Sequence, residues 1–370
     1  MLDSARLSKR QIAIALGLLS ISCGGSPGGP TLPTPLYDVV AVVFYDENGN
    51  GRPDAAEAGR VPDVDVGVEG RIGRTEKLTG RAVIHGVPAG EAEVQIRRRR
   101  LPAFYLPGQP LTIQVPQAPG TEAYLPATLP IGSNRPNTYM AFGDSITRGD
   151  GSSDGMGYRG LLEADLQGYF GAGAVINQGV EGTRSNAGAD RIPRSLAAVR
   201  PAYTLIHYGV NDWNDFRCQR SFPCFTQESL AQMVRASKAA NSLPFLATII
   251  PGNPAFPQVP PERNNWVHAE DEALRAMAGE EGAVLVDLEA AFLKKGDLTQ
   301  LFADHIHPND RGYQIMADEF FKAIKSPNDA IAQGLFEMPS FGFVAPQQDA
   351  THAGRRARGV LRPDEPGRRR

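Results

Sequence analysis

The chain has 370 residues, of which 41% are hydrophobic and 21% are charged. At about 150 residues per domain, this length suggests two domains with additional segments, and the composition is that of a globular protein rather than a disordered chain, a collagen or a membrane bundle. The net charge is −3, from 38 basic and 41 acidic side chains. Because no excess of positive charge is available to bind phosphates, we expect no nucleic-acid partner.

Residues 1–22 have the features of a signal peptide. Arg6, Lys9 and Arg10 precede an apolar run from 12 to 21. This run is shorter than the about 20 apolar residues that span a bilayer, but its length is typical of the hydrophobic region of a secretory signal. We therefore expect the protein to be exported.

Cys23 follows a small residue at the end of this run. The arrangement resembles the lipobox of bacterial lipoproteins, which implies that Cys23 is lipidated, becomes the mature N-terminus and anchors the protein to a membrane of the cell envelope or surface. Ser20 stands where that family usually has Leu, so plain cleavage and an uncleaved anchor stay open as alternatives. Residues 23–36 are rich in Gly and Pro and are expected to form a flexible linker.

Residues 37–130 contain short, alternating apolar runs that are separated by Gly and Pro. This pattern predicts a β-sandwich. The runs lie at 39–45, 64–68, 82–87, 92–96 and 111–115.

A calcium-loop pattern lies inside this region. Oxygen donors occupy the alternating positions of a 12-residue EF-hand-type loop, with Gly51 at the sharp turn. The donors are Asp46, Asn48, Asn50, Arg52 through its backbone carbonyl, Asp54 and Glu57. The flanking segments are strand-like, so the host is not a helix–loop–helix. The alternative is a hairpin turn with solvated acids.

The stretch from about 37 to 96, which includes YDENGNGRPDAAEAGRVPDVDVGVEG, resembles the prealbumin-like, calcium-binding B-type repeats of bacterial surface adhesins. It also resembles the related carboxypeptidase-regulatory-like domains. The resemblance implies a rigid extracellular spacer or binding module in which a structural Ca²⁺ stabilises the loop.

From 136 to 325, apolar runs alternate with amphipathic helical segments. The runs lie at 138–142, 174–177, 204–208, 245–250 and 283–288. The alternation predicts a parallel sheet with helices on both faces. Ligands bind such sheets at the carboxyl ends of the strands, so we expect the functional residues directly after the runs.

Residues with matched chemistry follow these runs: Ser145, Gly182, Asn211, and Asp304 with His307. A serine nucleophile needs a base, here His307, and the base needs an acceptor, here Asp304, that fixes its tautomer. The backbone N–H groups of Ser145 and Gly182 and the amide of Asn211 would stabilise an oxyanion. The pattern therefore predicts nucleophilic ester hydrolysis.

These blocks resemble the SGNH (GDSL-type) hydrolase family over about 136–325. They are GDS with Ser145, the glycine block with Gly182, GVND with Asn211 and DHIHP with Asp304 and His307, and GDSI replaces GDSL. The resemblance implies a three-layer, flavodoxin-like α/β fold, an acyl-serine intermediate, and no cofactor for catalysis.

The substrate is an ester, and we favour short-chain acyl groups such as acetyl on carbohydrate or small alcohols. A lysophospholipase or lipase and a non-catalytic surface binding module are the alternatives. Cys218 and Cys224 are expected to form a disulfide in an oxidising compartment, with two free thiols as the alternative. Residues 326–370 end in many arginines and are expected to form a disordered, solvated basic tail.

Overall fold

The computed structural model describes residues 34–220 and 222–326. These residues form two compact units, one of 34–98, 107–128 and 169–171 and one of 99–106, 129–168 and 172–326. The predicted signal peptide, Cys23 and the basic tail lie outside the described residues. Within the described part of the chain, no helix has both the length and the apolar composition needed to cross a membrane.

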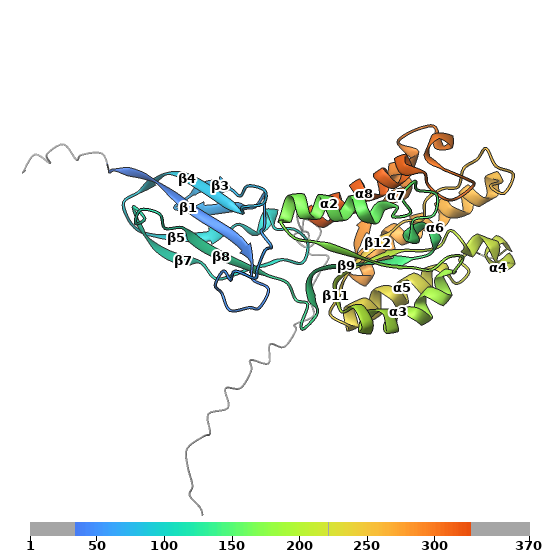
Figure 1. Cartoon of the computed structure of the whole chain (residues 1–370), viewed down its shortest axis with the longest axis horizontal. Coiled ribbons are helices and arrows are strands. Elements are labelled where there is room, and N and C mark those ends of the chain that lie inside the picture. Colours follow the sequence, from blue (N-terminus) through green and yellow to red (C-terminus); the bar gives the residue numbers. More distant parts are fainter. Residues whose placement is uncertain (1–33, 221, 327–370) are drawn as a thin grey trace, which may run out of the picture. The chain divides into compact units, whose positions relative to one another are not determined.

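Residues 34–128 form two four-stranded sheets, with the strand orders β4-β1-β8-β6 and β3-β2-β5-β7 (Figure 1). The strands are β1 (Leu36–Tyr45), β2 (Asp65–Val68), β3 (Arg71–Arg74), β4 (Arg81–Pro88), β5 (Gly90–Ile96), β6 (Leu106–Pro107), β7 (Leu111–Val115) and β8 (Ala123–Thr128). In β5, the alternating residues Ala92, Val94 and Ile96 are buried, as expected for a strand with one face in a core.

The five apolar runs of this region correspond to β1, β2, β4, β5 and β7. The predicted runs missed β3, whose four residues RIGR carry little apolar signal, the two-residue β6, and β8, whose sequence AYLPAT contains a proline. β8 pairs with β1 in parallel, and a short polar or proline-containing strand is recognised only from its partners.

The second unit contains, among its described residues, a five-stranded sheet with the order β10-β9-β11-β12-β13. All four neighbouring pairs are parallel. The strands are β9 (Arg135–Gly143), β10 (Ala174–Gly179), β11 (Pro201–His207), β12 (Leu243–Ala247) and β13 (Val284–Val286). Each contains or overlaps a predicted run, so the parallel α/β sheet is confirmed. Every residue of β11 and β12 is buried, because strands covered on both faces have continuous apolar sequences.

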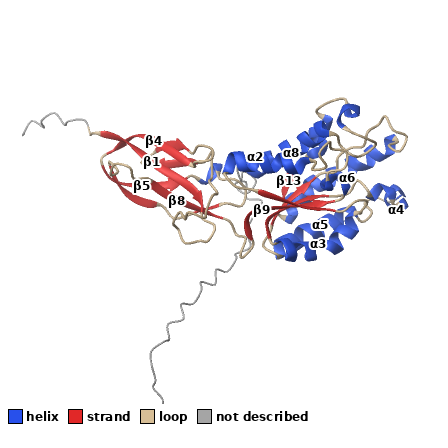
Figure 2. Cartoon of the chain, viewed as in Figure 1, coloured by secondary structure: helices blue, strands red, loops and turns tan. Residues whose placement is uncertain are grey.

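Helices cover both faces of this sheet, with α3 and α5 on one side and α2 and α8 on the other (Figures 1 and 2). The α-helices are α1 (Ser145–Arg148), α2 (Tyr158–Phe170), α3 (Ser185–Val199), α4 (Phe216–Arg220), α5 (Thr226–Ala239), α6 (Pro261–Glu281), α7 (Leu288–Leu293) and α8 (Asp310–Lys325). The 3₁₀ helices are η1 (Arg98–Arg100), η2 (Asp212–Asn214) and η3 (Leu298–Leu301). Tyr158 of α2 stacks on Phe320 of α8 with ring centroids 5.0 Å apart. If the five strands are numbered by their position in the chain, their order across the sheet is 2-1-3-4-5, which is the flavodoxin-like order.

Candidate active site

Three of the candidate residues follow the three strands β9, β10 and β11, where the order of the sheet reverses. From β9 the chain proceeds to β10 on one side and then to β11 on the other. In open parallel sheets the crevice outside the carboxyl ends of the strands at this reversal is the usual ligand site. Ser145, Gly182 and Asn211 come shortly after β9, β10 and β11, respectively.

Ser145 is the first residue of α1, directly beyond β9. Asp144 caps this helix, because its Oδ1 accepts the N–H of Ile146 at 3.0 Å. Gly143 permits the tight exit from the strand, since a Cβ there would lie 2.1 Å from Thr147 Oγ1 and 2.4 Å from the carbonyl oxygen of His207. Glycine is therefore required before the Asp-Ser pair.

Ser145, His307 and Asp304 form a continuous hydrogen-bonded row. Ser145 Oγ lies 2.9 Å from His307 Nε2, and His307 Nδ1 lies 2.7 Å from Asp304 Oδ2. Asp304 Oδ1 also accepts the backbone N–H groups of Ile306 and His307 at 2.9 and 2.8 Å. A neutral His307 with its proton on Nδ1 satisfies both contacts, because Nε2 is then free to accept the serine proton.

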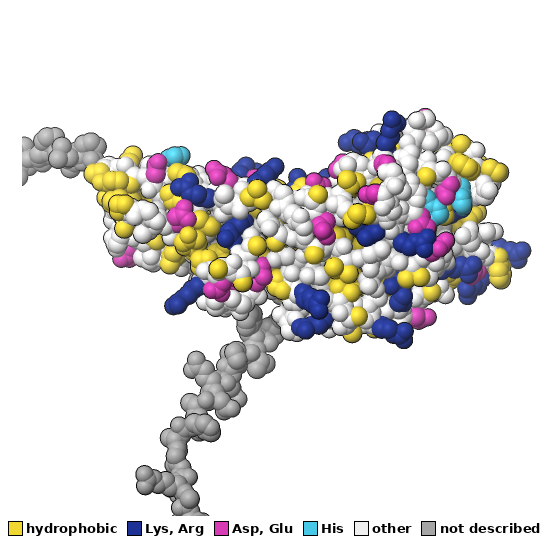
Figure 3. All heavy atoms as spheres, viewed as in Figure 1, with side chains coloured by type: hydrophobic (Ala, Val, Ile, Leu, Met, Phe, Trp, Pro, Cys, Tyr) yellow, Lys and Arg dark blue, Asp and Glu magenta, His cyan; other side chains and the backbone are white. Residues whose placement is uncertain are grey.

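The environment of Asp304 favours its charged form. Burial raises the pKa of its carboxyl, but the hydrogen bonds from the His307 ring and from the two backbone N–H groups outweigh burial and hold the pKa below its usual value. His305 Nδ1 also lies 3.7 Å from Asp304 Oδ1. Of the two histidines, His307 is the one that contacts Ser145 Oγ. Histidine side chains are visible on the molecular surface at this end of the sheet (Figure 3).

Asn211 connects two of the loops that surround Ser145. Its Nδ2 donates to the carbonyl oxygen of Thr183 at 3.1 Å and lies 3.4 Å from Asp144 Oδ2. The amide is therefore held between the loop that contains Gly182 and the cap of the Ser145 helix. The three predicted oxyanion donors thus belong to segments that the structure brings together.

Asp212, the next residue, is buried and anchors the loop after β11. It accepts the N–H and hydroxyl of Ser185 at 2.8 and 2.5 Å and the hydroxyl of Thr226 at 2.8 Å. Burial raises the pKa of Asp212 above its usual value. Burial also raises the pKa of Asp144 to about 7. The hydrogen bond from the Ile146 N–H lowers this pKa, and the nearby charge of Asp212 raises it.

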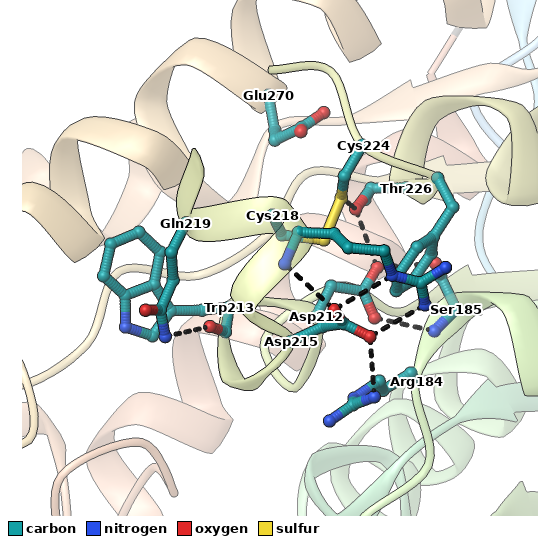
Figure 4. The surroundings of a disulfide bond; sticks show 12 residues. Arg184, Ser185, Asp212, Trp213, Asp215, Cys218, Gln219, Cys224, Thr226 and Glu270 are labelled. Carbon is teal, nitrogen blue, oxygen red and sulfur yellow. Dashed lines mark hydrogen bonds and ion pairs between the residues drawn. A yellow bond between two sulfur atoms is a disulfide. The ribbon is translucent and has the colours of Figure 1, made fainter. Parts of the chain in front are cut away.

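A disulfide closes the next part of this loop (Figure 4). Cys218 and Cys224 are joined with an S–S distance of 2.05 Å. Cys224 Sγ lies 3.3 Å from the hydroxyl of Thr226, which in turn donates to Asp212. The disulfide is thus connected to the residue beside Asn211 by two side-chain contacts.

The predicted calcium loop folds around two buried carboxylates, Asp46 and Glu57, which are each 4% exposed. Asp46 accepts backbone N–H groups at 2.8 to 3.1 Å, and so does Glu57 at 3.0 to 3.4 Å. Asp54 Oδ2 accepts the side-chain amides of Asn48 and Asn50 at 2.6 and 2.8 Å. Arg52 donates its N–H to Asn50.

In the part of the chain that the structure describes, no three His, Cys, Asp or Glu side chains are grouped so as to hold a metal ion. The predicted loop relies also on asparagine and backbone oxygens, so this finding does not test calcium binding. Calcium binding therefore stays a prediction.

The comparisons with known proteins agree with the geometry of the second unit. The model of the GDSL-like lipase/acylhydrolase family matches residues 141–315, which include every predicted residue of the triad and the oxyanion hole. Esterase TesA of Pseudomonas aeruginosa is 30% identical over 176 residues, which are 46% of this chain and 79% of that protein. The chain belongs to the GDSL-like lipase/acylhydrolase family. It is therefore an ester hydrolase, of a family that needs no cofactor for catalysis.

Two solved structures are similar to part of this chain. LAE5, an α/β hydrolase from the metagenome of Lake Arreo, is 25% identical with a TM-score of 0.43, over 52% of this chain and 96% of that one. A variant of Axe2, an acetyl-xylooligosaccharide esterase from Geobacillus, is 23% identical with a TM-score of 0.43, over 52% of this chain and 95% of that one.

Proposed function

We propose that this protein is a serine esterase that removes short acyl groups, acetyl above all, from carbohydrates or small alcohols through an acyl-serine intermediate. The observation that carries the proposal is the row Ser145 Oγ, His307 and Asp304, with contacts of 2.9 and 2.7 Å. A nucleophile, a base and an acceptor aligned in this way have no use in a purely binding surface.

In the first half-reaction, Ser145 Oγ bonds to the carbonyl carbon while its proton passes to His307 Nε2. The carbonyl electron pair becomes an oxyanion, which accepts hydrogen bonds from the N–H groups of Ser145 and Gly182 and from Asn211 Nδ2. For this bond, Asn211 Nδ2 gives up part of its long 3.4 Å contact with Asp144 Oδ2. The tetrahedral adduct then expels the alcohol oxygen, which takes the proton from His307. Asp304 stabilises the imidazolium throughout.

In the second half-reaction, a water oxygen bonds to the acyl carbon while His307 Nε2 accepts the water proton. The second adduct breaks its bond to Ser145 Oγ, which regains a proton from His307, and the carboxylic acid leaves. Both halves use the same donors, so the loss of any one donor slows the whole cycle.

The loops beside Ser145 support a short acyl group. Residues 149–157, GDGSSDGMG, and 180–184, VEGTR, consist mostly of glycine and polar residues. Their exposed large apolar side chains are Met156 and Val180. Two such side chains offer little surface to a long acyl chain, each buried CH₂ of which would contribute about 0.8 kcal/mol of binding free energy.

The test is hydrolysis of p-nitrophenyl esters from acetate to palmitate by the full-length protein and by Ser145→Ala. We expect kcat/KM to fall with chain length and the activity to vanish in the variant. A maximum at long chains would favour a lipase or lysophospholipase. If a folded protein hydrolyses no ester and a fluorophosphonate does not label Ser145, the protein is a binding module and the proposed reaction is wrong.

We also propose that the protein is exported and anchored through a lipid on Cys23, which lies outside the described residues. The basic residues and apolar run before Cys23 support this proposal. Metabolic labelling with an alkyne fatty acid tests it: wild-type protein should carry the label and Cys23→Ser should not. Label on both would exclude Cys23 as the acceptor.

The N-terminal unit is proposed to be a separate β-sandwich domain over about 37–130, with Ca²⁺ held by the loop 46–57. Its two four-stranded sheets support the first part. The second part is supported by the donor chemistry, because the side chains at the alternating positions offer carboxylate and amide oxygens, which suit a hard cation.

A further inference from the structure

Arg191 of α3 contacts the carboxyl ends of three neighbouring strands. Its Nη2 lies 3.2 Å from the carbonyl oxygen of Gly143 at the end of β9 and 2.9 Å from that of Gln178 near the end of β10. The same nitrogen lies 2.7 Å from the hydroxyl of Tyr208, the residue after β11. One guanidinium group therefore holds three chain segments that are far apart in sequence.

Each of these segments leads within a few residues to a proposed oxyanion donor. Ser145 comes two residues after Gly143, and Gly182 four residues after Gln178. Asn211 comes three residues after Tyr208. A shift of any one strand end relative to the others would therefore move one donor relative to the other two.

A directed hydrogen-bond chain extends this connection to the amide of Asn211. Tyr208 accepts from Arg191, and its hydroxyl lies 3.2 Å from Thr183 Oγ1. Because Thr183 Oγ1 donates to the carbonyl oxygen of Val180 at 2.6 Å, it accepts the Tyr208 proton. The Thr183 carbonyl oxygen accepts Asn211 Nδ2, so the chain ends at the donor itself.

The bonding of Arg191 is unusual for a partly buried cation. Among residues 34–220 and 222–326 no carboxylate forms an ion pair with it, and its acceptors are neutral oxygens. Its Nε is buried and has no hydrogen-bond partner in the described part of the chain. The guanidinium plane lies against Phe142 of β9, with Cζ 4.1 Å from the ring centroid, which adds a cation–π contact. The planar guanidinium lies over this ring while its Nη2 reaches the three oxygens, a combination that the compact ammonium group of lysine reproduces only in part.

We propose that Arg191 is a positioning residue that keeps the N–H groups of Ser145 and Gly182 and the amide of Asn211 in register as one oxyanion hole. The part of this inference that concerns catalysis rests on the proposed esterase function. Arg191 itself does not touch the reacting atoms, so its effect is on the transition state through the three donors.

The test compares Arg191→Gln and Arg191→Lys with wild type and with Arg194→Gln, an exposed arginine one turn further along the same helix. A misplacement of about 1 Å costs about 100-fold in rate, so we expect kcat for p-nitrophenyl acetate to fall by about 100-fold in Arg191→Gln with little change in KM. Arg191→Lys retains the charge, so its kcat should fall by less than that of Arg191→Gln. It is also the variant to use if Arg191→Gln fails to fold. Arg194→Gln should match wild type.

Amide hydrogen exchange provides a readout that does not depend on esterase activity. We expect faster exchange in Arg191→Gln over 143–146, 178–183 and 208–212, and no change over 244–250, which Arg191 does not contact. Unchanged exchange in these three segments, or an unchanged kcat, would overturn the proposal. If wild type hydrolyses no ester but the three segments still exchange faster, the esterase function fails while the structural role of Arg191 stands.

Discussion

The side-chain nitrogen of Asn211 lies 3.4 Å from Oδ2 of Asp144, while Oδ1 of the same carboxylate caps the helix that begins at Ser145. One buried acid therefore connects the nucleophile to the oxyanion donor that lies furthest from it along the sequence.

Asp144→Asn should separate these two roles. The new side chain can still cap the helix with its carbonyl oxygen, but its amide nitrogen faces that of Asn211, and two donors cannot pair. Losing this contact costs about 1 to 3 kcal/mol, which, as lost positioning of Asn211 in the transition state, corresponds to a fall in kcat of about 5- to 150-fold. An unchanged kcat would show that Thr183 alone is sufficient to hold Asn211.

The two histidines near Asp304 should differ sharply in their effects. Only His307 contacts Ser145 Oγ, and His305 lies 3.7 Å from Asp304 without that contact. We expect His307→Ala to lower kcat by about 10⁶-fold, as for loss of the catalytic base, and His305→Ala to keep most of the activity. Steady-state kinetics with p-nitrophenyl acetate measure both, and comparable losses would contradict the assignment of the base.

The sequence was sufficient to predict the parallel sheet and the residues at its edge. Buried parallel strands appear as continuous apolar runs, so the positions of Ser145 and Asn211 relative to β9 and β11 could be inferred without a structure. Arg191, Thr183 and Tyr208 carry no comparable signal. Their roles depend on which side chains meet when α3 packs on the sheet, and residues from separate segments meet only in the folded chain.

The disulfide should stabilise the loop after β11. It closes a loop of sequence separation 6, for which the loop-entropy model gives about 2 kcal/mol. We expect the double variant Cys218→Ser with Cys224→Ser to melt at a lower temperature. Because Thr226 joins Cys224 to Asp212, we also expect a reduced kcat. A reducing agent should produce the same changes in wild type and none in the double variant; if it changes both proteins equally, the disulfide is not the cause.

Calcium should raise the melting temperature of the N-terminal unit. Binding to the folded state alone stabilises it by about 2.7 kcal/mol at a concentration 100 times Kd. Calorimetry of the full-length protein in excess Ca²⁺ and in chelator measures the shift, which should disappear in Asp46→Asn combined with Glu57→Gln. The exposed Glu91→Gln is the matched control and should respond as wild type does. Equal melting curves of wild type in calcium and chelator would favour the hairpin turn with solvated acids.

Glu270 of α6 should make the stability of the protein depend on pH. Its side chain is buried, Oε2 accepts Gln227 Nε2 at 3.1 Å, and Oε1 has no partner among the described residues. Burial raises the pKa of Glu270 from 4.5 to about 7. The hydrogen bond from Gln227 lowers this pKa, and the nearby charge of Asp212 raises it further.

Because the pKa of Glu270 is higher in the folded than in the unfolded state, the folded state loses stability as the pH rises from about 4.5 to about 7. Glutamine does not titrate. The difference in melting temperature, Glu270→Gln minus wild type, should therefore increase between about pH 5 and pH 8. The altered hydrogen bond to Gln227 adds an offset to this difference that does not change with pH. Glu280→Gln, an exposed change on the same helix, should show a constant difference. A constant difference for Glu270→Gln as well would mean that Glu270 is already ionised in the folded protein across this range, with its unpartnered oxygen solvated.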